Sequence, residues 1–203
     1  MTIRLASMAL GVVLLFAAMV PPDRIDGSRP LAVHMAELVL VVYVAAPLLA
    51  WPAPLLAGRW TLPRVAGVWC ALAVAQSAIH LPAALIPELH HGAVHGLVQA
   101  GMLALAVLCW SGIAAWPAER SPAGPIAILL ASIPAGDALS LWLLGATHPI
   151  AGGISTGDQR AAAAMMFTAS IVLGLAALAV GARAVRREHA QQLLRERTEA
   201  RHA

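Results

Sequence analysis

The sequence predicts an all-α membrane protein: a polytopic bundle of about six transmembrane helices, followed by a short cytoplasmic C-terminal helix. Three observations lead to this fold class. The 203-residue chain is 60% hydrophobic and only 11% charged, whereas soluble domains carry about 25% charged residues. Its mean hydropathy is +0.79. Its apolar residues also gather into long runs, and roughly 20 such residues are enough to cross a bilayer as a helix.

Five segments are long and apolar enough to cross a bilayer, and a shorter one precedes them. Proline, glycine and charged residues separate the segments, as is usual between helices. The first segment, after Arg4, also fits the apolar region of a signal peptide, but no small-x-small cleavage site follows it, so we expect an uncleaved span. The predicted spans are residues 5–20, 31–57, 64–86, 92–116, 125–146 and 161–182, within a membrane bundle over residues 1–183 and before a basic tail over residues 184–203.

The arginines predict how the bundle is oriented. All thirteen basic residues are arginine, and loops on the cytoplasmic side of a membrane carry an excess of positive charge. With the N-terminus inside, ten arginines face the cytoplasm and only Arg24, Arg29 and Arg160 face outward. We therefore expect both termini in the cytoplasm. The tail is expected to be a helix whose basic excess suits anionic lipids, and this location of the arginines argues against nucleic acid as a partner.

Six of the eight histidines then fall at the outer face. His34 opens the second span, His80 lies near the outer end of the third, and His95 lies at the start of the fourth. Polar groups in a span are costly and usually serve a site or a partner. Three imidazoles converging from three helices suit copper, zinc or haem iron. These histidines predict a metal or cofactor site at the outer face.

Neighbouring residues extend the candidate ligand set. His91 precedes the third histidine by four positions, so the two are expected to share a helix face. Met35 is next to the first histidine, and Met166 lies at the outer start of the last span; thioether with imidazole favours Cu(I). Glu37, one turn inward from the first histidine, is a candidate ligand, a hydrogen-bond acceptor for a ligating imidazole or a proton carrier.

Four polar residues are candidates for a supporting role around that site. Asp137 lies near the middle of the fifth span, as a functional group or as a protonated carboxyl bonded to freed backbone or to Ser140. Asp158 can cap the N-terminus of the last span, and Gln159 follows it. Gln99 lies one turn after the third histidine of the set.

Four stretches of the chain, in order, carry a resemblance to a known family. They are "HMAELVLVVYVAAPLLA", "IHLP", "VHGLVQAGMLALAVLCW" and "GDQRAAAAMMF", and they cover about residues 31–182. At these residues the sequence resembles the CtaG-type cytochrome c oxidase assembly factors, a family of bacterial polytopic proteins. The resemblance implies an inner-membrane location and copper handling outside the membrane by His34, His80 and His95, with Asp158 and Gln159 as a paired motif.

The chain also departs from the family pattern, as well as being short for it. The family often has a second histidine one turn after the first and third motif histidines, where this chain has Leu38 and Gln99. Ala163 and Phe167 stand where glycine and tryptophan are common. Glu37 and His91 are the residues that would compensate for the missing ligands.

Three functions remain open at this point. The first is a non-enzymatic assembly factor that holds Cu(I) for an oxidase, with cytochrome c oxidase subunits and periplasmic copper chaperones as partners beside the lipid bilayer. The second is a b-type membrane redox protein in which His34 and either His80 or His95 ligate haem axially. The third is an accessory subunit without a cofactor. The sequence has no nucleophile–base pair, phosphate-binding glycine loop or HExxH motif, so we expect no enzyme activity.

Overall fold

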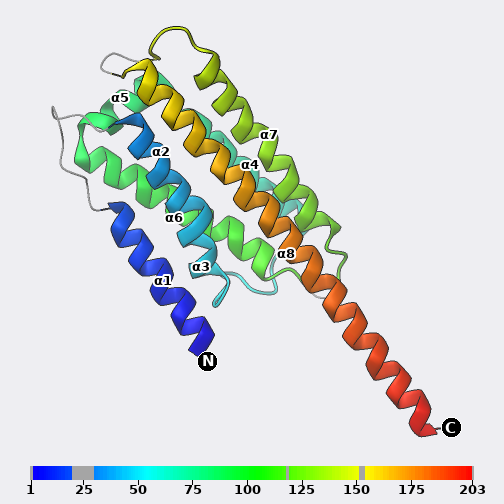
Figure 1. The fold of residues 1–203 in the computed structure, drawn as a ribbon. Helices are drawn as coiled ribbons and strands as arrows, with labels where there is room; N and C mark the ends of the chain where they lie inside the picture. The colour runs from blue at the N-terminus through cyan, green and yellow to red at the C-terminus, as the bar shows by residue number, and fades with distance from the viewer. Residues whose placement is uncertain (1, 20–29, 118, 151–153, 203) are drawn as a thin grey trace.

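The computed structural model describes residues 2–19, 30–117, 119–150 and 154–202, and every regular element in those ranges is helical. The helices run back and forth along a common direction and form a bundle (Figure 1). The predicted all-α fold class is therefore confirmed. Five helical stretches are long and apolar enough to cross a membrane: Leu31–Ala50, Leu62–Ile79, Gly92–Ala114, Ala123–Gly145 and Thr156–Ala200.

Helix α1 (Thr2–Met19) packs along the first of these long helices. The Ser7 hydroxyl donates a hydrogen bond to the Leu48 carbonyl at 3.0 Å. At Gly11 an added Cβ would lie 3.1 Å from the side chain of Leu49, so glycine allows the two helices to approach closely. The apolar part of α1, Arg4–Phe16, is shorter than the other five stretches. Its role as a sixth span remains a prediction.

The helix over residues 31–50 contains a wide turn that a proline explains. It consists of α2 (Leu31–Val39), the π-helical segment η1 (Leu40–Ala45) and α3 (Ala46–Ala50). At the end of η1 the N–H of Ala46 donates a hydrogen bond to the Val41 carbonyl. The next carbonyl, that of Val42, would need the N–H of Pro47, which proline lacks. The Trp110 indole donates to that carbonyl instead, at 2.8 Å.

The third predicted span, residues 64–86, is interrupted in the structure. Helix α4 (Leu62–Ile79) ends at His80, and a separate helix α5 (Pro82–His90) follows before α6 (Gly92–Ala114). Proline disfavours helical geometry in the residue that precedes it. Leu81, which precedes Pro82, is accordingly extended, with ψ of 137°. The proline therefore separates α5 from α4. The second predicted span also ends early, because its helix stops at Ala50 instead of reaching residue 57.

Helices α7 (Ala123–Gly145) and α8 (Thr156–His202) complete the bundle, and α8 packs against both α7 and α2. The predicted C-terminal helix is present, but it continues the last span without a break. From Glu188 to Ala200 every residue is exposed, and this part of α8 extends beyond the other helices (Figure 1).

Candidate metal centre

The end of the bundle where α2 begins is organised by a carboxylate from another helix. Pro30, at the N-cap of α2, makes no side-chain capping bond. The Asp158 carboxylate accepts hydrogen bonds from the main-chain N–H groups of Leu31 and Ala32, at 2.7 and 3.0 Å. The prediction that Asp158 caps its own helix is wrong, because Ser155 accepts the bond from the Asp158 N–H. Asp158 lies in the first turn of α8 and caps α2.

Gln159 connects the same end of α8 to α7. Its side-chain amide nitrogen donates to the Leu143 carbonyl at 2.8 Å, and its amide oxygen accepts from the Ile150 N–H at 3.0 Å. The residue is 1% exposed. Asp158 and Gln159 thus bind main-chain groups of α2, of α7 and of the segment after α7. These hydrogen bonds hold in place the helix ends around the candidate site.

Three buried imidazoles meet at this end of the bundle. His34 comes from the first turn of α2, His80 terminates α4, and His95 lies in the first turn of α6. The ring centroid of His34 is 5.8 Å from that of His80 and 6.1 Å from that of His95. The structure thus brings together the three histidines that the sequence singled out. His80 was expected inside a helix and instead forms its C-cap, because of the break before Pro82.

A glutamate that sequence reasoning missed lies between two of these histidines. Glu88 Oε1 is 3.4 Å from His34 Nδ1 and 3.5 Å from His95 Nδ1, and Glu88 is 1% exposed. The available signal was an acid on an apolar helix face: Glu88 shares its face of α5 with Leu85 and Leu89, at helical spacing. Because residues 64–86 were taken as one span, the helix that buries Glu88 was not anticipated.

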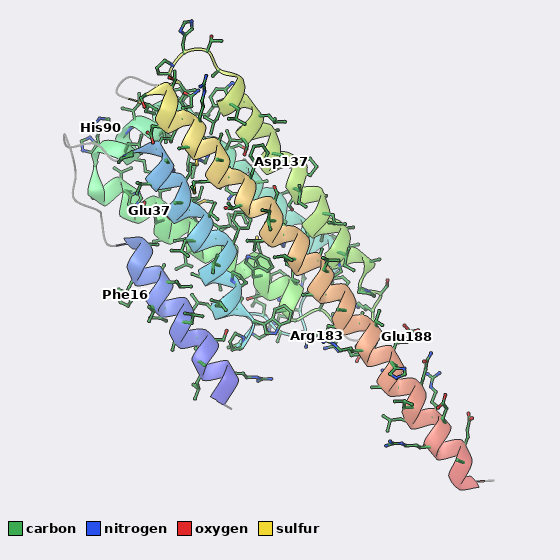
Figure 2. The ribbon with its side chains drawn as sticks, in the orientation of Figure 1. Phe16, Glu37, His90, Asp137, Arg183 and Glu188 are labelled. Atoms are coloured by element: carbon green, nitrogen blue, oxygen red, sulfur yellow. The ribbon has the colours of Figure 1, made fainter. Side chains whose placement is uncertain are left out.

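Glu37 lies on the other side of His95. Its Oε2 is 3.3 Å from His95 Nε2, so a carboxylate faces each ring nitrogen of this histidine. Glu37 is on α2 one turn after His34 and is 7% exposed. Figure 2 marks its place within the bundle. The cluster therefore contains two carboxylates as well as three imidazoles.

His80 faces a thioether. Its Nδ1 lies 2.5 Å from the Gln76 carbonyl oxygen, and because a carbonyl only accepts, Nδ1 carries the hydrogen. In the neutral ring Nε2 then presents a lone pair, 3.1 Å from the Met35 sulfur. Met35 is fully buried. A thioether has no hydrogen to donate, so these two atoms form a pair of soft electron donors side by side.

The cluster fits a metal ion by distance and by donor type. Imidazole nitrogen and carboxylate oxygen bind a tetrahedral ion at about 2.0–2.2 Å, which places ligand atoms roughly 3.3–3.5 Å apart. The contacts of Glu88 with His34 and His95 have this length, and one ligand atom from each of the three residues lies within 4.8 Å of the others. Neither Glu88 oxygen receives a conventional hydrogen bond from a described residue.

The structure also places the other residues that were predicted for the site, one as a ligand and two in a supporting role. His91 is exposed and forms the N-cap of α6 with extended backbone, φ −117° and ψ 107°, so it does not share a helix face with His95. Gln99 is buried one turn after His95. Met166 is buried on α8 and lines a small cavity of about 30 Å³ together with Gln76.

Of the alternatives considered for Asp137, a bond to Ser140 is wrong. Its carboxylate accepts a hydrogen bond from the Ser170 hydroxyl at 2.6 Å, across to α8. Ser140 bonds the Gly136 carbonyl within its own helix instead. This hydrogen bond therefore links Asp137 of α7 to Ser170 of α8.

A bundle of membrane-length helices with a buried histidine–glutamate cluster at one end defines a polytopic membrane protein with a candidate metal centre. The model of the cytochrome c oxidase caa3 assembly factor family (Caa3_CtaG) matches residues 2–188, and the chain belongs to this family. The resemblance seen in the sequence is therefore confirmed. Neither the search of curated proteins nor that of solved structures found a match.

Proposed function

We propose that this protein holds copper in the buried cluster and passes it to a haem–copper oxidase during assembly. Membership of an oxidase assembly family supports the second half of this proposal. The observation that carries the first half is the meeting of three imidazoles, a carboxylate and a thioether within one buried cluster. His34, His80, His95, Glu88 and Met35 are the residues we assign to the ion.

The donor set explains how one site serves copper. Thioether and imidazole suit Cu(I), whereas imidazole with carboxylate also suits Cu(II). His80 and Met35 supply the soft pair, and His34, His95 and Glu88 supply the remaining donors. Holding and releasing the ion requires no change in its oxidation state. The residues of the chain select, hold and release the ion.

Release requires a route out of a buried cluster, and α5 is the element that we assign to it. This helix has nine residues and carries Glu88. It is bounded by the extended residues Leu81 and His91, which interrupt the helical backbone on both sides. A displacement of α5 would remove one donor and open the cluster without moving the long helices. A transfer site needs such an exchangeable ligand.

The geometry favours copper over haem. Axial ligation places an imidazole nitrogen against the face of the macrocycle. Glu88 Oε1 lies within 3.5 Å of nitrogens of both His34 and His95, and the His34 ring meets the other two edge-to-face. A porphyrin could enter only if these groups moved apart. The compact donor set suits a single ion.

A cofactor-free accessory role is the second candidate, and one observation favours it. The imidazole–carboxylate distances of 3.3–3.5 Å also suit buried ion pairs of imidazolium with glutamate. Metal analysis of the purified protein, with and without added Cu(I), separates the two candidates. Stoichiometric copper supports the metal centre, and protein that stays free of copper under Cu(I) loading supports the ion-pair role.

We expect His80→Ala to impair oxidase assembly more than His148→Ala. His80 is 2% exposed and lies beside Met35, whereas His148 is exposed after α7. Losing a ligand should weaken copper binding at least ~10-fold, by comparison with the loss of groups that only orient ligands. The measurement is oxidase activity and copper content in cells with matched membrane levels of the variants. Full activity in both variants, or a larger loss for His148→Ala, would contradict the copper assignment.

A further inference from the structure

A second candidate site lies where α8 leaves the bundle. A cleft of about 510 Å³ is formed by Trp51 after α3, the connection between α6 and α7, and α8 from Val180 to Gln191. Along α8, Arg183 is 24 positions after Gln159, or about 36 Å at the rise of an α-helix. The hydrocarbon core of a bilayer is about 30 Å thick. Figure 2 shows His90, two residues after Glu88, near one end of the bundle and the cleft residues Arg183 and Glu188 near the other, so the cleft and the histidine cluster lie toward opposite ends.

Positive charge exceeds negative charge in the cleft. The arginines lining it are Arg120, Arg183 and Arg187, and the acids are Glu119 and Glu188. Among the described residues no ion pair joins these arginines to either acid. Arg59 and Arg64 add further positive charge to the loop that follows α3 and to the start of α4. The cleft is thus suited to an anion.

Two tryptophans hold the guanidinium groups at its walls. The guanidinium carbon of Arg183 lies 5.1 Å from the ring centroid of Trp51, and that of Arg120 lies 5.8 Å from that of Trp116. Arg120 also donates to the Trp60 carbonyl at 3.1 Å. Stacking on a ring face fixes the plane of a guanidinium and leaves its edge donors able to bind an oxyanion. Tryptophan is also typical of the membrane–water interface.

An apolar surface runs from this cleft toward the middle of the bundle. Leu175, Leu178 and Val185 on α8 are 60%, 70% and 66% exposed, and Val185 itself lines the cleft. Their spacing of three and seven residues places them on one face of the helix. An amphiphilic ligand would find basic groups at the cleft and a hydrocarbon-compatible face beside it.

We propose that this cleft binds the phosphate-bearing head group of an anionic phospholipid, whose acyl chains lie along the exposed face of α8. A phosphodiester carries a negative charge that balances the excess of arginine over glutamate in the cleft, and guanidinium groups bind phosphate through paired hydrogen bonds. Basic pockets between membrane helices recognise such head groups. Arg120 and Arg183 hold the phosphate, and Trp51 and Trp116 orient these two side chains.

The test is native mass spectrometry of the full-length protein in detergent, titrated with phosphatidylglycerol or phosphatidylcholine. We compare R120Q/R183Q with the control R195Q/R197Q, which removes the same charge from the exposed part of α8. We expect the first pair to weaken phosphatidylglycerol binding about 10- to 30-fold, because each arginine near the membrane surface contributes roughly one order of magnitude or less to the affinity. The control pair should change it less than about threefold, and phosphatidylcholine should bind weakly to all variants.

Equal losses in both double variants, which indicate unspecific attraction, would overturn the proposal, and so would equal binding of the two lipids. Inorganic phosphate and glycerol 3-phosphate are titrated alongside, and binding of either as tightly as the lipid would assign the cleft to a soluble phosphate instead. Circular dichroism checks the fold of each variant. The single change R120Q, at an exposed side chain, provides a second measurement with an expected loss in the same direction.

Discussion

Glu88 is the residue on which the chemistry of the histidine cluster depends most. Burying the Glu88 carboxylate to 1% exposure costs several kcal/mol in desolvation, and nearby positive charge offsets this cost. Two sources of that charge are compatible with its neighbours: imidazolium rings of His34 and His95, or a metal ion bound by the same nitrogens. In either case, removing the carboxylate charge removes an interaction that holds His34 and His95 together.

We expect Glu88→Gln to weaken copper binding at least ~10-fold, because the neutral amide keeps the shape of the side chain and loses the anionic ligand. The measurement is competition for Cu(I) against a chromogenic chelator, using purified protein. Glu199→Gln, on the exposed part of α8, is the matched control and should bind copper as the unaltered protein does. Unchanged affinity in Glu88→Gln would remove this residue from the ligand set.

At the scale of single helices, α2 shows how a helix end can be completed by a distant segment. The helix starts after Pro30 without a side-chain cap of its own, and its first N–H groups carry a partial positive charge. Asp158 supplies both the hydrogen bonds and the negative charge. His34 lies in the same turn, so the cap also sets the position of a candidate ligand.

Replacing Asp158 by alanine should therefore lower both stability and copper affinity. We expect a loss of about 1–2 kcal/mol in the free energy of unfolding, which is typical for the loss of a helix cap. Thermal unfolding and copper titration of the purified variant measure the two effects. Glu196→Ala, on the exposed part of α8, should alter neither. A variant that is destabilised but binds copper normally would show that the cap stabilises the helix without positioning His34.

The whole molecule has two chemically different ends. Histidines and glutamates gather where α2 and α8 begin and α4 ends, and arginines gather where α8 leaves the bundle. Cytoplasmic segments of membrane proteins are enriched in arginine. The orientation predicted from these same arginines, in which the histidine cluster faces outward, remains a prediction.

A reporter fused after Ala203 tests that orientation. We expect activity only for a reporter that works in the cytoplasm, because α8 carries the chain toward the arginine-rich end. The same reporters inserted between Thr147 and Pro149, in the connection after α7, should give the opposite result. Periplasmic activity after Ala203 would reverse the orientation and place the histidine cluster in the cytoplasm.

The sequence by itself determined the fold class, the approximate location of the five long helices and the three histidines of the cluster. The reason is that long apolar runs must satisfy their own backbone hydrogen bonds in lipid, and only a few structures do so. Helices of bilayer length that alternate in direction then bring His34, His80 and His95 to the same end. These features follow from local composition and spacing.

Tertiary structure decided which further groups join those histidines. Glu88 reaches the cluster only because α4 breaks before Pro82 and α5 packs its apolar face inward. Asp158 caps a helix 127 positions away in sequence, and His91 is left exposed although it lies four positions from His95. Each outcome depends on contacts between segments that are separate along the chain. Local patterns show which side chains are suited to such contacts, and only the packing of the helices selects their partners.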